Sequence, residues 1–439
     1  MRWTRDQLAA AVNGVATGPD ITIEWVTQDS REVADNAGSL FIPLIAERDG
    51  HDFIGSAIAA GAVATFAARS VDTDGLVIRV DDTAAALTAL GVDARRRLEG
   101  ADVIGITGSV GKTTTKDLLA AVLRTSRRTH ANARSFNNEI GVPLTLAQAP
   151  EDAEAVVIEM GARGVGHIAE LCAVARPTVG IVTTVGSAHT SEFGSIETVA
   201  DGKGELIEAL PREADGGVAV LNADVPLVAA MAGRTDASVV TFGQGGDVRA
   251  TNIVLDDELV PSFTVESPWG SAPARLGARG IHLVDNALAA LAAALPLGVS
   301  LLDAVAALAA PVLSPMRMAL RTTESGARVL DDTYNANPMS MAAALRSLAH
   351  IPATRRVAVL GVLAELGDES ASEHRRMASL AADLGIRVVA FDAPEYGDGI
   401  DHVDTIETAL DAVGPLGASD ALLAKGSRVA GLERLVDLL

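Results

Sequence analysis

In the stretch GITGSVGKTTTKD, residues 105–117, Lys112 and three threonines directly follow Gly111. Glycines such as Gly108 and Gly111 allow backbone N–H groups to turn inward around phosphate oxygens, and a helix N-terminus adds partial positive charge. Lys112 can neutralise the charge of the β- and γ-phosphates, and the Thr113 hydroxyl can ligate Mg²⁺. These residue types at this spacing predict a nucleoside triphosphate site.

The stretch departs from the common phosphate-loop pattern, G-x-x-x-x-G-K-[ST], at one position. The first glycine of that pattern would fall at 106, where the chain has Ile106. Cradling phosphate with backbone N–H groups does not require a glycine there. The simpler interpretation is a glycine turn closed by an ordinary helix start, and Gly-Lys-Thr between a strand and a helix argues against it.

The elements that must position this loop are readable on both sides of it. Residues 101–109 form a β-branched strand that runs into a glycine turn, and residues 113–126 carry apolar side chains at helical spacing. Two more continuous apolar strands are predicted at 155–161 and 178–186. Strands of this kind, alternating with helices, predict a parallel sheet covered on both faces.

The chain is too long for one ordinary core. With 439 residues, two or three domains are expected, and composition breaks lie near residues 100 and 312. Strand-like runs alternate with helices again beyond 312, so the last part is another α/β unit. We predict an α/β protein of three domains, at 1–100, 101–311 and 312–439.

Composition limits the partners and the location of the chain. Its formal net charge of −22 argues against general nucleic-acid or anionic-membrane binding, because phosphate contacts need a basic surface. Cys172 is the single cysteine, so no internal disulfide forms, and the N-terminal residues lack a signal-peptide shape.

Residues 287–313 are the most membrane-like, but Pro, Gly, Ser and Asp interrupt them, which predicts two Ala-rich helices rather than a span. We expect a cytoplasmic protein without membrane insertion; a monomer is the expectation, although composition leaves the oligomeric state open.

The form TGSVGKTTT resembles the nucleotide loop of the Mur ligases, the ATP-dependent enzymes that build the peptide of the bacterial cell wall. That family uses this variant loop, and the resemblance covers nearly the whole chain. The other matching stretches follow in the family's order: DSREVADNAGSLFIPL, DGHDFIGSAIAAGA, FNNEIGVPLTL, EMGARGVGHIAEL, TTVGSAHTSEFGSIETVADGKGEL, DDTYNANPMSM, LGVLAELGDES and KGSR. The resemblance implies a small UDP-sugar-peptide binding domain, a central P-loop ATPase domain, and a C-terminal Rossmann-like domain that closes over ATP and binds the dipeptide.

The activity implied by the resemblance is amide ligation in two steps. ATP phosphorylates a substrate carboxylate, and an amine then attacks the acyl phosphate and releases phosphate. The stretches FNNEIGVPLTL and DDTYNANPMSM favour the branch whose substrates are UDP-N-acetylmuramoyl-tripeptide and D-alanyl-D-alanine, the last cytoplasmic peptide-assembly step of peptidoglycan precursor synthesis. The third residue of that tripeptide is not readable from the sequence.

The resemblance assigns residues to ATP and to two Mg²⁺ sites. Asn286 would recognise adenine, and Arg317 and Asp332 would close over ATP. The chain departs from the usual family pattern at two nearby positions: Met316 stands where the family usually has glycine before that arginine, and Leu283 stands where it more often has asparagine. The nucleotide loop would contribute Gly108, Ser109, Gly111, Lys112, Thr113 and Thr114. The metal ligands would be Thr113, Glu159, His189 and Lys203. Lys203 would act as a carbamate formed with CO₂, because a bare ammonium would repel the metal. The catalytic set is Lys112, Lys203, His189 and Arg317.

The other substrates would contact all three predicted domains. Ser30, Arg31, Asp49, Gly50 and His51 are the candidates for the UDP site. Asn137, Asn138 and Glu139 are the central-domain candidates. Asn335 and Asn337 would shape the carboxylate and dipeptide region, and Lys425 and Arg428 would bind an anionic group or simply end a strand.

Three other functions remain open at this point. Another ligase of the same superfamily, adding a single amino acid, shares the loop, Glu159 and His189. A P-loop ATPase or GTPase switch would hydrolyse nucleotide without an acceptor. The sequence shows no motif like N-K-x-D, with which a GTPase normally recognises guanine. A dinucleotide-binding oxidoreductase is disfavoured, because GITGSVGK lacks the G-x-G-x-x-G spacing.

Overall fold

The structure is a computed structural model, and it describes residues 1–439 except 37, 133–135 and 187–193. The chain divides into two compact units. The first comprises residues 1–105, 126–162 and 166–180, and the second comprises 106–125, 163–165 and 181–439. The α/β architecture with parallel sheets agrees with the prediction.

The first hundred residues form a five-stranded sheet in the order β2-β7-β6-β5-β4. All neighbours are parallel except β2 and β7. The strands are β2 (Val15–Thr17), β4 (Trp25–Thr27), β5 (Ser39–Phe41), β6 (Ala64–Ala67) and β7 (Leu76–Arg79), and β1 (Trp3–Thr4) pairs separately with β3 (Thr22–Ile23). The helices are α1 (Arg5–Ala11), α2 (Ile54–Ala59) and α3 (Thr83–Arg97). α3 begins after Asp82 because that carboxylate accepts hydrogen bonds from the N–H groups of Ala84 and Ala85, a standard helix cap.

The nucleotide loop belongs to a six-stranded sheet in the order β13-β12-β11-β8-β10-β9. Its strands are β8 (Asp102–Thr107), β9 (Thr129–Ala131), β10 (Ala155–Glu159), β11 (Val179–Val182), β12 (Val218–Asn222) and β13 (Ser238–Phe242). The helices of this region are α4 (Lys112–Leu123), α5 (Gly141–Gln148), α6 (His167–Ala175), α8 (Ile196–Glu208), α9 (Pro226–Ala229), α10 (Leu283–Ala294) and α11 (Leu301–Ala307). The predicted strands at 101–109, 155–161 and 178–186 are β8, β10 and β11, and the Ala-rich pair is α10 and α11. Their continuous burial confirms the sequence interpretation.

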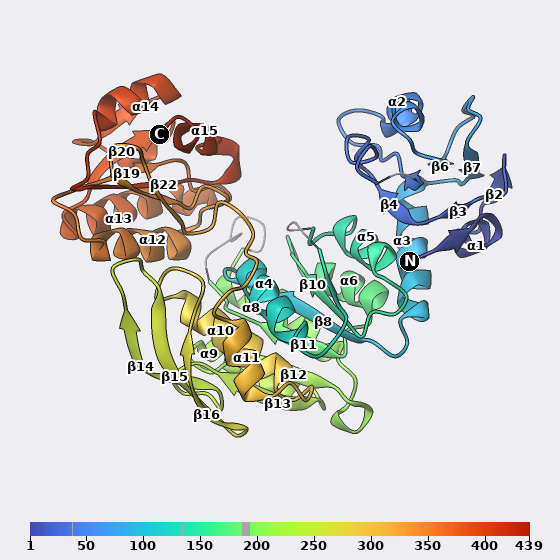
Figure 1. The fold of residues 1–439 in the computed structure, drawn as a ribbon, viewed down its shortest axis with the longest axis horizontal. Helices are drawn as coiled ribbons and strands as arrows, with labels where there is room; N and C mark the ends of the chain where they lie inside the picture. Colours follow the sequence, from blue (N-terminus) through green and yellow to red (C-terminus); the bar gives the residue numbers. More distant parts are fainter. Residues whose placement is uncertain (37, 133–135, 187–193) are drawn as a thin grey trace. The chain divides into compact units, whose positions relative to one another are not determined.

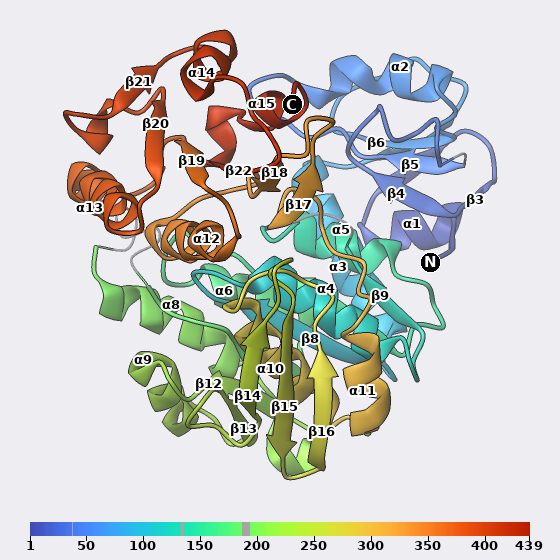
Figure 2. The same ribbon diagram turned by 60° about the vertical axis from the view of Figure 1, so that its left-hand side comes forward.

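A three-stranded antiparallel sheet, β14 (Arg249–Leu255), β15 (Pro261–Ser267) and β16 (Gly270–Arg275), was not predicted. A register shift between Thr251 and Val254 interrupts the pairing of β14 with β15. Figure 2 shows these strands side by side, with α11 against β16.

The last part of the chain folds around a six-stranded sheet in the order β17-β18-β22-β19-β20-β21. The strands are β17 (Ala319–Thr322), β18 (Arg328–Asp331), β19 (Arg355–Leu360), β20 (Arg387–Phe391), β21 (Asp401–Val403) and β22 (Asp420–Lys425), with only β17 antiparallel to its neighbour. Helices α12 (Pro338–His350) and α13 (Ser370–Asp383) cover one face, and α14 (Ile406–Val413) and α15 (Glu433–Val436) cover the other (Figure 1).

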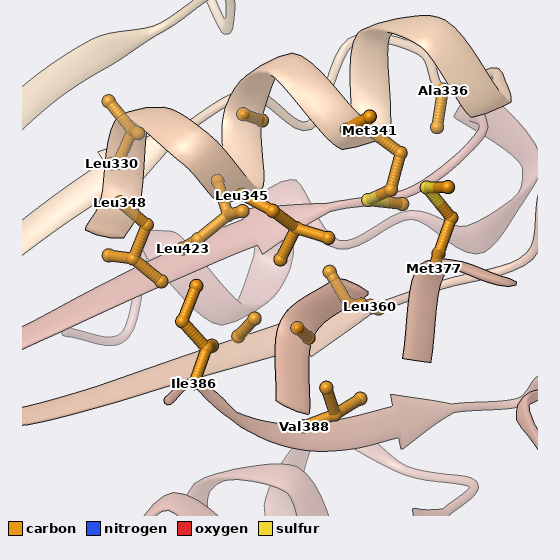
Figure 3. Packing of buried hydrophobic residues seen from close by; sticks show 14 of the residues in the cluster. Leu330, Ala336, Met341, Leu345, Leu348, Leu360, Met377, Ile386, Val388 and Leu423 are labelled. Atoms are coloured by element: carbon orange, nitrogen blue, oxygen red, sulfur yellow. The ribbon is translucent and has the colours of Figure 1, made fainter. Parts of the chain in front are cut away.

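Apolar side chains fill both faces of this C-terminal sheet. Leu345 and Leu348 of α12 belong to one cluster with Leu423 of β22 and Met377 of α13 (Figure 3). A second cluster, which includes Val359 and Leu435, fills the opposite face. Among the described residues, no helix is long and apolar enough to cross a membrane.

Candidate active site

The nucleotide loop runs from the end of β8 at Thr107 to the start of α4 at Lys112. Gly108 has φ +151° and Gly111 has φ +88°, so both adopt backbone conformations that disfavour other residues. Gly111 is the N-cap residue of α4, and no side chain caps the helix there. The helix start is therefore shaped for an anion, because its N-terminal N–H groups and dipole carry partial positive charge.

Close packing explains why glycine stands at both positions. A Cβ atom at Gly108 would lie 1.9 Å from Oγ1 of Thr183, and one at Gly111 would lie 2.3 Å from Nδ2 of Asn286. Thr183 also donates a hydrogen bond of 2.6 Å to the carbonyl of Val110 inside the loop. Thr183 was not among the predicted site residues; its only signal is its place directly after a buried strand.

Two lysines contribute positive charge to this region. Lys112 donates from Nζ to the carbonyl of Gly108, 2.6 Å away, so its ammonium lies over the loop. Lys203 on α8 is only 2% exposed. Burial, and next the charge of Lys112, lower the pKa of Lys203 to about 7. A lysine at such a pKa is partly a neutral amine near neutral pH, which the sequence could not indicate.

Asn286 of α10 contacts the nucleotide loop through hydrogen bonds. Its Nδ2 donates to the carbonyl of Gly111 at 3.1 Å and to Oγ1 of Thr115 at 2.9 Å. The side chain is buried. Asn286 is therefore at the nucleotide loop, and its role in recognising adenine stays a prediction.

Arg317 and Asn337 reach the loop from the chain beyond residue 312. Arg317 donates from Nη2 to Oγ1 of Thr113 at 3.0 Å, and its guanidinium lies 4.2 Å from the centre of the Tyr334 ring. Asn337 caps α12 and donates from Nδ2 to the carbonyl of Ser109, 3.4 Å away. The structure thus brings these two predicted residues to the predicted nucleotide loop.

The buried ammonium of Lys425 forms an ion pair with Asp332, the first residue of the loop 332–337. Nζ of Lys425 lies 2.5 Å from Oδ2 of Asp332 and donates to the carbonyl of Asn335 at 2.8 Å. Oδ1 of Asp332 accepts from the N–H of Met318. Arg428, by contrast, is exposed and pairs with Glu433 at 3.3 Å.

The first unit holds the predicted metal ligand Glu159 at the end of β10. Glu159 is 2% exposed, and its Oε1 accepts a hydrogen bond of 2.9 Å from Nδ2 of Asn137. Oδ1 of Asn138 accepts from the N–H of Gly141, the first residue of α5, and Glu139 is exposed. His189 lies outside the described residues. Among those that the structure describes, no group of three or more His, Cys, Asp or Glu side chains could hold a metal.

The predicted UDP-site residues Asp49, Gly50 and His51 form a tight turn. Nδ1 of His51 lies 2.6 Å from Oδ1 of Asp49, and its Nε2 accepts from the N–H of Ala68 at 3.0 Å, so Nδ1 carries the proton. The pKa of Asp49 is lowered, chiefly by the hydrogen bond that its carboxylate accepts from the backbone N–H of His51. A Cβ atom at Gly50 would lie 2.5 Å from the carbonyl oxygen of Leu44.

The other two UDP candidates lie in a turn after β4. Arg31 is largely exposed and forms a bidentate pair with Asp29, at 2.8 and 2.6 Å. The pKa of Arg31 is raised, chiefly by its side-chain hydrogen bond to Asp29. Ser30 lies between them and is half-buried. These contacts fix the turn and leave the guanidinium at the surface.

Comparison with known proteins decides the family. Residues 106–294 match the Mur ligase middle domain, and residues 316–428 match the Mur ligase glutamate ligase domain. The UDP-N-acetylmuramoyl-tripeptide–D-alanyl-D-alanine ligase of Mycobacterium tuberculosis (strain ATCC 25618 / H37Rv) is 40% identical, over 95% of this chain and 92% of its own length.

The chain belongs to the Mur ligase family.

Solved structures of Mur ligases agree with this assignment. A crystal structure of MurF from Acinetobacter baumannii superposes with a TM-score of 0.88 at 32% identity, and covers 100% of this chain and 99% of its own. MurF ligase from Thermotoga maritima, solved in complex with ADP, superposes with a TM-score of 0.79 at 30% identity, over 94% and 96% of the two chains. The Mur ligase fold therefore spans the full length of the chain, including the parts outside the two matched domains.

Proposed function

We propose that this Mur ligase joins D-alanyl-D-alanine to the terminal carboxylate of UDP-N-acetylmuramoyl-tripeptide, with ATP converted to ADP and phosphate. The observation that carries the proposal is the near full-length match to ligases named for that reaction, on a chain whose nucleotide loop is intact. The predicted boundaries at residues 100 and 312 would separate the UDP-binding, ATP-binding and C-terminal domains.

The chemistry needs a good leaving group on the carboxylate. A carboxylate oxygen attacks the γ-phosphorus of ATP and ADP departs; the dipeptide amine then attacks the acyl carbon and phosphate departs. The chain's task is to position the reactants and to neutralise charge, as in other phosphoryl transfers. Phosphate leaves more readily than oxide, which is why the first step is required.

The loop residues fit a triphosphate. Gly108 and Gly111 bring backbone against the ligand, and Ser109 and Thr114 line the same loop. Lys112 would turn from the carbonyl of Gly108 toward the β- and γ-phosphates, because a phosphate oxygen is a stronger partner for an ammonium than a carbonyl is. Arg317 would add a second cation next to Thr113.

The residue types predicted as ligands suit Mg²⁺, which typically takes one or two carboxylates together with phosphate oxygens and water. We assign Thr113, Glu159 and a carbamate on Lys203 to it, and His189 as the family resemblance implies. Bound Mg²⁺ would supply charge neutralisation on the phosphates. The neutral amine of Lys203 is the form that attacks CO₂, so its low pKa supports the carbamate.

Substrate contacts follow from the positions above. Ser30, Arg31 and the turn at 49–51 would take the UDP group, and Asn137, Asn138 and Glu139 the sugar-peptide. Asn335 and Asn337 would shape the dipeptide region. Because the ammonium of Lys425 contacts Asp332 and Asn335, we assign Lys425 to shaping that loop rather than to holding an anion of the substrate. Arg428, which is exposed, stays a candidate for anion binding. We also propose that the protein works as a monomer in the cytoplasm, where ATP is supplied.

The test is phosphate release with ATP, Mg²⁺ and UDP-N-acetylmuramoyl-tripeptide, with D-Ala-D-Ala or single amino acids offered in turn. We expect turnover that depends on the dipeptide and that Lys112→Ala reduces by about 10³-fold or more, since the lysine supports the transferring phosphoryl group. Circular dichroism of the variant would show that it is folded. Dependence on a single amino acid would instead identify another ligase of the superfamily, and equal rates for the two proteins would overturn the site.

The carbamate has its own test. With ¹³C-bicarbonate, the folded protein should show a ¹³C NMR carbamate signal that is absent from Lys203→Met. A signal of equal size in the variant, or none in the wild-type protein in the presence of ADP and Mg²⁺, would contradict the assignment.

A further inference from the structure

Residues 308–318 connect α11 to β17 and carry Arg317, without helix or strand of their own. Backbone N–H groups in such a segment still need partners. The N–H of Ser314 donates to Oδ2 of Asp117 at 2.7 Å. Three residues on, Arg317 donates to Oγ1 of Thr113 at 3.0 Å.

Both acceptors lie on α4, and four residues, about one helical turn, separate them. Side chains at i and i+4 occupy the same face of a helix. The connecting segment is therefore held against one stripe of the helix that begins at the nucleotide loop, with Ser314 at the far turn and Arg317 at the near one.

The local chemistry makes the Asp117 contact strong. A hydrogen bond from an N–H to a carboxylate is shorter and stronger than one to a neutral acceptor. The Asp117 side chain is only 10% exposed, and the ammonium of Lys116 lies 3.2 Å from its other oxygen, which balances the buried charge. From the sequence alone Asp117 would be taken for an ordinary solvated helix residue.

We propose that Asp117 is a positioning residue, which anchors the connecting segment on α4 and thereby sets the place of Arg317 at the nucleotide loop. Asp117 touches no reacting atom in this scheme; it acts through Ser314 and Arg317. The inference rests on the ligase function proposed above, because Arg317 matters there for the phosphates. A shift of the guanidinium by about 1 Å can cost up to about 10²-fold in rate.

The first experiment examines the anchor without substrates. Hydrogen exchange followed by mass spectrometry would compare peptides covering residues 308–318 in the wild-type protein, Asp117→Ala and Asp117→Asn. We expect faster exchange in Asp117→Ala and near wild-type exchange in Asp117→Asn, whose amide oxygen can accept the same bond. Unchanged exchange in Asp117→Ala would mean that there is no anchor. As a matched control, Asp303→Ala removes an exposed carboxylate from α11, the helix before the same segment, and should change nothing.

The second experiment is a double-mutant cycle in the phosphate-release assay. Asp117→Ala should lower kcat about tenfold or more with little change in KM for ATP. In an Arg317→Ala background the same change should have almost no further effect, because the group that it positions is already gone. Effects that multiply would show an independent or merely structural role, and equal loss in Asp117→Asn would assign the effect to charge; either result overturns the proposal. If wild-type protein shows no dipeptide-dependent turnover, the proposed function fails, and the exchange experiment alone decides whether the anchor exists.

Discussion

The ammonium of Lys425 and the carboxylate of Asp332 lie 2.5 Å apart, one at the end of β22 and the other just beyond β18. The lysine is 1% exposed, and its ammonium also contacts the carbonyl of Asn335. This pair joins the last parallel strand to the loop of residues 332–337, which carries Asn337 to the nucleotide loop.

Removing the lysine alone should therefore destabilise the fold. Lys425→Met leaves a mostly buried carboxylate without its partner, and we expect a loss of about 3 kcal/mol in the free energy of unfolding, measured by urea denaturation. Asp332→Asn in the same chain should recover part of that loss, because the uncompensated charge disappears. A double variant no more stable than Lys425→Met would show that packing, rather than the ion pair, holds this loop.

Gly111→Ala should impair nucleotide binding through a specific collision. The new Cβ would lie 2.3 Å from Asn286, so the asparagine must move and its bond to the loop is lost. We expect ADP affinity, measured by calorimetry, to fall about tenfold or more, on the scale of a lost buried hydrogen bond and a displaced side chain.

Gly216→Ala is the matched control for that change. Gly216 has φ +84°, close to the +88° of Gly111, but nothing lies within 4 Å of its Cβ position. The alanine there should cost about 1 kcal/mol of stability from the left-handed backbone alone and leave ADP binding intact. If both variants bind ADP equally well, contact with Asn286 does not shape the loop.

Burial of Lys203 should appear in the pH dependence of stability of the unmodified protein. Its pKa is about 7 in the folded state, against 10.5 for an ordinary lysine, so the unfolded state binds more protons between these limits. The free energy of unfolding should therefore gain up to about 1.4 kcal/mol per pH unit from this residue as pH rises from 7 toward 10.5. Below pH 7 both states are protonated, and the full penalty of burying the charge is present.

Lys203→Met isolates that contribution. The difference in stability between variant and wild-type protein should be largest below pH 7 and should shrink as pH rises toward 10, as measured by urea denaturation at each pH without bicarbonate. A difference that does not vary with pH would show that the lysine keeps its proton in the fold.

Met316 occupies a position that suits glycine. Its φ is +58°, a left-handed conformation that L-residues adopt at a cost. Met316→Val should lose about 1–2 kcal/mol by thermal or urea unfolding, since a β-branched residue is the least tolerant of this conformation. Met316→Gly should be at least as stable as the wild-type protein. A Met316→Gly variant that is less stable than the wild-type protein would mean that the contact of the Met316 sulfur with Arg428 outweighs backbone strain.

The sequence by itself determined the strand, turn and helix around Gly108–Thr114, because glycine freedom, β-branched runs and helical spacing act within a few residues. It also determined the strands β8, β10 and β11, whose burial shows in their continuous apolar runs, and the two Ala-rich helices, of which α10 is almost wholly buried and α11 only in part. It did not reveal the antiparallel sheet of β14–β16. These strands have few apolar residues on their exposed face, and the sheet is specified by pairing between strands.

Only the tertiary structure decided the chemistry of individual side chains. In sequence, Lys203 and Asp117 look like ordinary solvated charges, and Lys425 looks like an anion contact or a strand end. Their burial, and in the last two cases partners 90 or more residues away, come from how the chain packs. A pKa depends on solvent exclusion and on charges brought close in space, and a positioning hydrogen bond depends on where another segment lies. Neither quantity has a local signature, so neither could be predicted before the fold was known.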